Sequence, residues 1–275
     1  MSFLQNLSHY KEQDEHTFEV AFDSSWTQGR TLFGGAVGAL AHNLMGQKLG
    51  DAWGLRSIMV DFLAPITAQK LVVKVEVIRQ GRTLVRIQAQ FYQQEKYCCI
   101  ALGVFGRSRS GAFPVAPASM PPVKPASECL GFPEKIGPIP EFAQYFDYRW
   151  AKTNFPYSGS TDSVLLGWIQ PRNQKVNVDY LIAMIDAWPP PILSLSDRPF
   201  PVSSVNWLLN IHQGIPAEGL PKEDWYLFES KLQFANEGCM DLTARLWDQK
   251  GNLLGISRQL LVEFSDKVFT PKGSS

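Results

Sequence analysis

Hydrophobic positions follow a helical period in two segments of this chain and a strand-like period in most of the others. The segment 35–49, GAVGALAHNLMGQKL, predicts a helix because its apolar residues recur at helical spacing. Four segments after it are rich in alternating apolar and polar residues, and QGR separates two of them as a turn. The first part of the chain therefore predicts one helix and an antiparallel sheet, with strands at 17–22, 56–63, 71–79, 83–93 and 97–105.

The same order recurs in the second part of the chain. A helix is predicted at 177–188, where three prolines at 189–191 end it. The turn DQKGN separates the last two of the strands that follow. We assign no strand to the region 146–170, and we expect strands at 203–212, 225–235, 240–248 and 253–264.

A proline-rich stretch separates the two parts. Eight prolines fall between Gly111 and Pro140, a density that excludes a helix interior or a central strand. The two parts can be overlaid, helix on helix and strand on strand, at a period of about 145 residues, which fits the duplication of a whole domain. We therefore expect an α+β protein with domains at 1–110 and 146–275 and a linker at 111–145, each domain a central helix wrapped by a curved antiparallel sheet.

Composition narrows the classes of function. The chain has 275 residues, with 26 Lys plus Arg and 26 Asp plus Glu, so it lacks the basic excess of a nucleic-acid-binding protein. It shows neither the apolar core of a secretory signal nor an apolar run of membrane-spanning length, which predicts a soluble, cytoplasmic protein. Its four cysteines have no C-x-x-C spacing, so we expect reduced, mostly structural thiols and no metal site.

Several motifs carry a resemblance to a known family. RTLFGGAVGALAHNL, the stretch from VDFLAPI to CCIALGVF, and IDAWPPPI, SSVNWLLNIH and LLGISRQLLVEF resemble segments of the acyl-CoA thioesterase II family. The likeness covers most of the chain outside the linker and 146–176. It implies a tandem (double) hot-dog fold and hydrolysis of acyl-CoA to free acid and CoA without cofactor or metal. Sheet edges can join subunits, so we also expect a homo-oligomer, a dimer or larger.

The resemblance also implies a site in the second half. The family's Asp, hydroxyl residue and Gln, which orient a water molecule on the thioester, match Asp186, Ser204 and Gln259. Serine stands where threonine is usual, and the neighbouring Ser203 is an alternative hydroxyl. Ala36 stands where a polar residue is common in the family.

The residues themselves point the same way. Asp186 lies among apolar residues at a helix end, where burying a carboxylate is costly unless it has a partner, although it could instead bind local backbone donors. Gln259 shares a strand face with small residues that leave room for a ligand, although it could also face solvent. Gly34 and Gly35 open a helix, where free N–H groups can bind an oxyanion, or where glycine serves only a tight turn.

Two other functions remain open at this stage. One is a non-hydrolytic protein that binds acyl thioesters in a degenerate hot-dog site. The other is a hot-dog enoyl-thioester hydratase with an Asp and His pair at the helix entry, which is less favoured because no histidine lies near Asp186 in the sequence. His42 and His212 both have structural interpretations. Neither the acyl chain length nor the choice between CoA and a carrier protein follows from the sequence.

Overall fold

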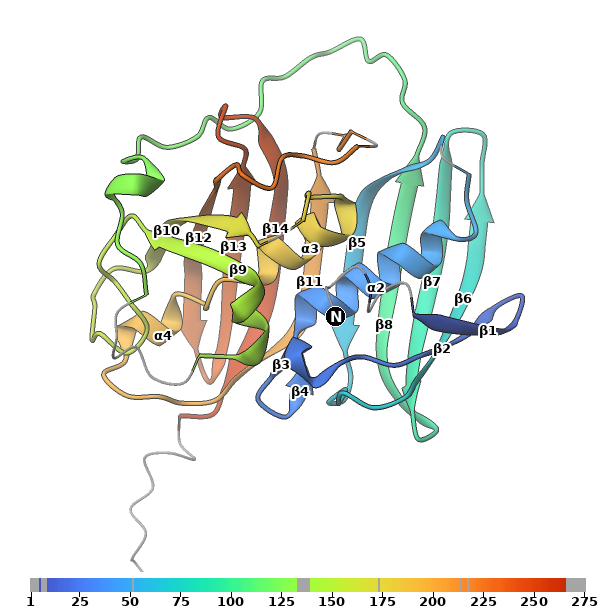
Figure 1. Ribbon diagram of the computed structural model, residues 1–275, viewed down its shortest axis with the longest axis horizontal. Coiled ribbons are helices and arrows are strands. Elements are labelled where there is room, and N and C mark those ends of the chain that lie inside the picture. The colour runs from blue at the N-terminus through green and yellow to red at the C-terminus, as the bar shows by residue number, and fades with distance from the viewer. Residues whose placement is uncertain are drawn as a thin grey trace, which may run out of the picture.

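One long antiparallel sheet dominates the molecule (Figure 1). The computed structural model describes residues 5, 9–50, 52–132, 139–172, 174–212, 214–216 and 218–265. Twelve strands within these ranges pair in the order β1-β2-β6-β7-β8-β5-β11-β14-β13-β12-β10-β9. They are β1 (Tyr10–Asp14), β2 (Thr17–Val20), β5 (Gly54–Phe62), β6 (Leu71–Gln80), β7 (Leu84–Gln93), β8 (Lys96–Gly106), β9 (Phe146–Trp150), β10 (Val164–Pro171), β11 (Val202–Ile211), β12 (Tyr226–Asn236), β13 (Cys239–Trp247) and β14 (Leu253–Glu263).

The connectivity repeats along the chain. Apart from the short strands β3 (Thr27–Gln28) and β4 (Thr31–Leu32) and the short helix α4 (Ile192–Leu195), the order strand, helix and four strands occurs first as β2, α2 (Gly34–Gly46), β5, β6, β7 and β8. It occurs again as β10, α3 (Val178–Asp186), β11, β12, β13 and β14. The two arrays meet at β5 and β11, where Trp207 pairs with Val60, and the Asn206 side chain donates a hydrogen bond of 2.5 Å to Asp61. One antiparallel sheet is therefore continuous across both halves of the molecule, which has few helices.

Helices α2 and α3 lie against each other on one face of the sheet (Figure 1). Helix α2 is buried on most of its surface because it lies between the sheet and α3. A side chain at Gly38 would lie 2.8 Å from the Trp207 ring and 3.2 Å from Ile182, so glycine is needed for this close approach. Asn177 caps α3 by accepting a 2.9 Å hydrogen bond from the Tyr180 amide.

The proline-rich segment crosses the molecule from β8 to the outer strands of the second half (Figure 1). Residues 107–125 have neither helix nor strand. Two tryptophans hold the segment: Trp168 Nε1 donates to the Lys124 carbonyl at 2.8 Å, and Trp247 Nε1 donates to the Ala118 carbonyl at 3.0 Å. The segment therefore packs on the outer face of the sheet, where Leu166, Leu227 and Leu253 are buried.

The main difference from the sequence expectation lies in 146–170, where β9 and most of β10 form. Strand β10, VLLGWIQP, is buried on both faces, because α3 and the core cover one face and the proline-rich segment covers the other. It therefore lacks the apolar and polar alternation of a half-exposed strand. Two short 3₁₀ helices, Ala126–Glu128 and Glu141–Tyr145, also form between β8 and β9.

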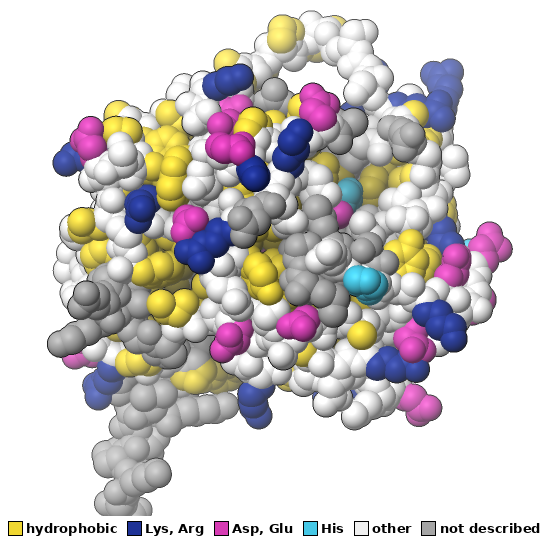
Figure 2. Space-filling model, viewed as in Figure 1, with side chains coloured by type: hydrophobic (Ala, Val, Ile, Leu, Met, Phe, Trp, Pro, Cys, Tyr) yellow, Lys and Arg dark blue, Asp and Glu magenta, His cyan; other side chains and the backbone are white. Residues whose placement is uncertain are grey.

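Charges of both signs are intermingled on the face seen in Figure 2. This distribution agrees with the equal numbers of acidic and basic residues in the sequence. No helix in the described part of the chain is both long and apolar enough to span a membrane.

Candidate active site

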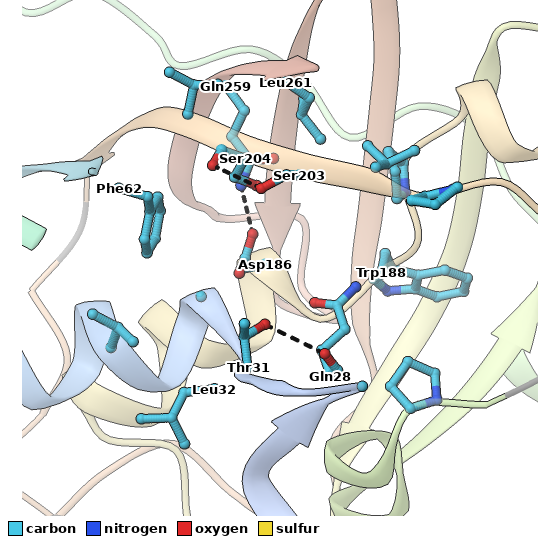
Figure 3. A pocket seen from close by; sticks show the side chains of 18 of the residues that line it. Gln28, Thr31, Leu32, Phe62, Asp186, Trp188, Ser203, Ser204, Gln259 and Leu261 are labelled. Carbon is cyan, nitrogen blue, oxygen red and sulfur yellow. Dashed lines mark hydrogen bonds between the residues drawn. The ribbon is translucent and has the colours of Figure 1, made fainter. Parts of the chain in front are cut away.

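A cavity of about 760 Å³ opens where the start of α2 meets the end of α3 and the inner face of β11 to β14. Its volume is in the range of small-molecule sites. Both halves of the chain contribute to its wall. Gly34 comes from the first half of the chain. Phe62 also comes from the first half, and Asp186, Ser204 and Gln259 come from the second (Figure 3). The structure thus brings four of the five predicted site residues to one cavity. The fifth, Gly35, does not line the cavity, but its backbone amide is hydrogen-bonded to Asp186.

Asp186 and Gln259 are hydrogen-bonded to each other (Figure 3). Gln259 Nε2 donates to Asp186 Oδ1 at 2.5 Å, and the Gly35 backbone amide also donates to the Asp186 carboxyl. Asp186 is the last residue of α3, which ends there because prolines follow from residue 189. The carboxyl is therefore fixed by one donor from β14 and one from α2.

The environment of Asp186 changes its proton affinity. Burial raises the pKa of Asp186 from 3.8 to about 7, while the hydrogen bonds from Gln259 and the Gly35 amide act in the lowering direction. The residue remains partly open to the cavity, so a ligand or water can reach it. A carboxyl with this pKa can accept a proton near neutral pH, which is what a general base requires.

Gln259 lies on the inner face of β14, and its exposed fraction is 7%. Gly255, Ser257 and Leu261 share this face and are also buried, as the strand periodicity predicts. Since Nε2 donates to Asp186, the amide carbonyl Oε1 is the group left to accept a hydrogen bond from a ligand or water.

Ser204 faces the cavity because β11 contains a bulge. Ser204 pairs with Leu261 and Asn206 pairs with Leu260, so Val205 is an extra residue between them. The bulge places Ser204 on the cavity side and leaves Asn206 to bond Asp61 at the junction of the halves. Within the described residues, the Ser204 hydroxyl bonds neither Asp186 nor Gln259. Ser203 also lines the cavity, and its hydroxyl donates at 3.5 Å to the Ser204 carbonyl.

The two glycines at the start of α2 have different surroundings. A Cβ on Gly34 would lie 2.9 Å from Asp186 Oδ2, and one on Gly35 would lie 3.0 Å from the Ala183 Cα atom. The Gly35 amide is directed at Asp186, whereas the Gly34 amide has no partner among the described residues and Gly34 lines the cavity. Gly34 therefore offers a free N–H beside the carboxyl at a helix start.

The sequence did not reveal a second polar contact between the helices. His42 Nδ1 lies 2.6 Å from Asp179 Oδ1, and Asn43 Nδ2 donates to Asp179 Oδ2 at 3.1 Å. The sequence feature that could have pointed to this contact is Asp179, an acidic residue in the first turn of an apolar helix. Its partner His42 lies on the other helix. No three His, Cys, Asp or Glu side chains cluster as a metal site in the ranges that the structure describes.

Two family models match this chain. The model of the acyl-CoA thioesterase N-terminal domain matches residues 22–106, and that of the acyl-CoA thioesterase C-terminal domain matches residues 116–262. None of the curated proteins matches the chain.

Solved structures share the fold over nearly the whole chain. A conserved protein with a hot-dog fold from Alicyclobacillus acidocaldarius is 18% identical with a TM-score of 0.85, covering 96% of this chain and 98% of that one. The tesB protein of Mycobacterium avium subspecies paratuberculosis is 13% identical with a TM-score of 0.78, covering 95% and 98%. An acyl-CoA thioesterase II from Mycobacterium marinum is 16% identical with a TM-score of 0.76, covering 96% and 98%. At these identities the structures show a shared hot-dog fold.

Proposed function

This chain belongs to the acyl-CoA thioesterase family, and we propose that it hydrolyses acyl-CoA thioesters to the free acid and CoA. The observation that carries the proposal is the hydrogen bond between Gln259 and Asp186, with a pKa of about 7 for Asp186, in a cavity large enough for an acyl group. The proposed catalytic residues are Asp186, Ser204 and Gln259.

The first step is the attack of water on the thioester carbonyl carbon. Asp186, as the carboxylate, takes one proton from the water as its oxygen forms the new bond to carbon. Gln259 is held by its bond to Asp186, so its carbonyl oxygen can orient the same water by accepting a hydrogen bond from the other O–H group of that water. The Ser204 hydroxyl, on the cavity side of the bulge, assists in holding water or the thioester.

The tetrahedral intermediate then needs a donor for its oxyanion. The Gly34 amide, at the start of α2 and beside Asp186, is suited to this role, while the Gly35 amide orients the Asp186 carboxyl. Collapse of the intermediate breaks the C–S bond, and the CoA thiolate takes the proton from Asp186. That transfer returns Asp186 to the carboxylate form in which it started, and the product carboxylic acid then loses its own proton to solvent.

The finer assignments of fold and assembly form part of the same proposal. The repeated order of helix and strands supports a tandem hot-dog protein, with domains at 1–110 and 146–275 and a linker at 111–145. Strands β1 and β9 lie at the two ends of the sheet, and Leu130 pairs with Trp150 on the outer side of β9. The end strand β1 in particular can join a second subunit, in support of a homo-oligomer.

Free-thiol release from a panel of short, medium, long and aromatic acyl-CoAs tests the proposal. We expect thiol release from at least one substrate, with an equal amount of free acid formed. A folded protein that binds acyl-CoA without releasing thiol would contradict the hydrolase assignment and support a non-hydrolytic binding protein instead. The same acyl groups attached to an acyl carrier protein, tested in parallel, show whether the acyl carrier of the substrate is CoA or a carrier protein.

A further inference from the structure

We propose that the cavity selects acyl groups that bear a hydroxyl substituent, and that Ser230 and Ser257 are the residues that recognise it. The inference rests on the proposed function, since it names the substrate class of the same cavity. Both serines line this cavity, together with Asp186 and Gln259.

The two serines lie in one row across three strands. Ser230 of β12 pairs with Ala244 of β13, and Ala244 pairs with Ser257 of β14. Neighbouring strands are about 4.8 Å apart, so the two serine backbones are about 10 Å apart with a small side chain between them. The row therefore forms a shallow floor with a hydroxyl at each end.

This row lies next to the proposed catalytic residues. Ser257 is two residues before Gln259 on the same strand face, which corresponds to about 7 Å along the strand. An acyl chain whose thioester carbonyl lies at Gln259 and Asp186 would pass over Ser257 and then extend toward Ser230. The two hydroxyls are thus placed to meet different positions of one acyl chain.

Both serine side chains are nearly enclosed, and their hydroxyls have no partner from the described part of the protein. Each serine has an exposed fraction of 2%, and neither hydroxyl has a hydrogen-bond partner in the part of the chain that the structure describes. Because both residues line the cavity, a group inside it can reach each hydroxyl, whereas alanine at either position would offer no polar contact. A polar group of the ligand can therefore bind the hydroxyls on the floor of the cavity.

Apart from the Trp188 indole N–H, which is buried and has no hydrogen-bond partner among the described residues, the rest of this part of the wall is apolar. Trp188 and Phe228 stack with ring centroids 5.6 Å apart, and Ile185 and Leu242 line the same cavity. These side chains fit the methylene groups of an acyl chain, whereas the serines need a donor or acceptor. An aliphatic chain with a hydroxyl substituent combines the two requirements.

The test compares substrates of equal length. Steady-state thiol release is measured for octanoyl-CoA and its 3-, 5- and 8-hydroxy derivatives, in the wild type, Ser230→Ala, Ser257→Ala and the double variant. Thr243→Ala is the matched control, because it removes a hydroxyl from the opposite face of β13. These substitutions remove no hydrogen bond made by Ser230 or Ser257 within the described residues, so we expect the variants to fold.

We expect at least one hydroxy derivative to have a kcat/KM about 2- to 10-fold above that of octanoyl-CoA, the size of one hydrogen bond. The ratio should fall to one or below in the double variant and stay unchanged in Thr243→Ala. Hydrolysis of all substrates with no preference for a hydroxyl would overturn the inference, because water alone would then satisfy the serines, and would leave the proposed function intact. A preference that survives in the double variant would overturn it as well.

Absence of turnover on every substrate would instead contradict the proposed function. Calorimetric binding of the same four acyl-CoAs to Asp186→Asn then decides the inference by itself. Tighter binding of a hydroxy derivative, lost when both serines are replaced in that background, supports it, and equal binding of all four overturns it.

Discussion

Gln259 Nε2 donates a 2.5 Å hydrogen bond to Asp186 Oδ1, joining the inner face of β14 to the last residue of α3 across 73 positions of sequence. Asp186 Oδ1 therefore accepts the bond from Gln259, and the amide oxygen of Gln259 is directed away from the carboxyl group. It also favours the ionised form of Asp186 in surroundings that otherwise disfavour it. The proposed base and the proposed water-orienting group are therefore one unit.

Hydrolysis should depend on pH through Asp186. Burial raises the pKa of Asp186 to about 7, so the carboxylate form that accepts a proton is lost as the pH falls through this value. We expect kcat/KM to rise about tenfold per pH unit below pH ~6 and to level off above pH ~8. A profile that is flat between these values, measured on a substrate whose own groups do not titrate there, would exclude Asp186 as the base.

Replacing Gln259 by glutamate should move this profile upward. Gln259→Glu replaces the amide donor with a second carboxyl beside Asp186, and like charges disfavour ionisation of both groups. We expect a pH profile displaced by about one unit or more to higher pH, with activity partly recovered at alkaline pH. An unchanged profile would show that Gln259 does not contact Asp186 in the working enzyme.

Gly34 should tolerate no side chain. In Gly34→Ala the new Cβ would lie 2.9 Å from Asp186 Oδ2 and would crowd the free amide, so we expect kcat to fall about 100-fold or more. Gly46→Ala, in the same helix, is the matched control because a Cβ there meets nothing within 4 Å. The control should keep both its activity and its stability, because Gly46 is the last residue of α2 and alanine is at least as favourable as glycine in a helix. Equal activity of the two variants would contradict the role of Gly34.

The raised pKa of Asp186 also predicts a change in stability. The folded protein binds the Asp186 proton more tightly than the unfolded chain does, because the folded pKa of about 7 exceeds the ordinary value of 3.8. This group therefore lowers the free energy of unfolding by roughly 1 kcal/mol per pH unit as the pH rises between these values, and the cost is complete above pH ~7. In Asp186→Asn the cost is absent.

Thermal unfolding at pH 5 and pH 8 checks this expectation. The Tm of Asp186→Asn should exceed that of the wild type by more at pH 8 than at pH 5. A difference that shrinks with rising pH would mean that the folded state does not raise the pKa of Asp186.

Much of the fold follows from local patterns in the sequence. The predicted helices at 35–49 and 177–188 correspond to α2 and α3, with ends that differ by a few residues. Half-exposed strands such as β7 and β14 were predictable because their side chains alternate between core and solvent. The family resemblance is confirmed by the two family models, while the roles of the site residues stay predictions.

Other features depend on contacts that no local pattern encodes. Strand β10 was missed because it is buried on both faces. The bulge at Val205, which turns Ser204 to the cavity, depends on how β11 pairs with β14. The contact of His42 with Asp179 requires that α2 and α3 pack against each other, although the two residues are 137 positions apart. In each case the determining partner is distant in sequence.

The most direct test of the account is thiol release from the preferred acyl-CoA by Asp186→Asn, compared with Asp179→Asn. Both variants neutralise a largely enclosed aspartate of α3, but Asp179 lies at the other end of the helix, where it bonds His42 and Asn43. We predict that Asp186→Asn loses at least about 100-fold in kcat while it still binds the substrate, and that Asp179→Asn keeps most of its activity when folded. Wild-type turnover in a folded Asp186→Asn protein would contradict the central claim that Asp186 is the base.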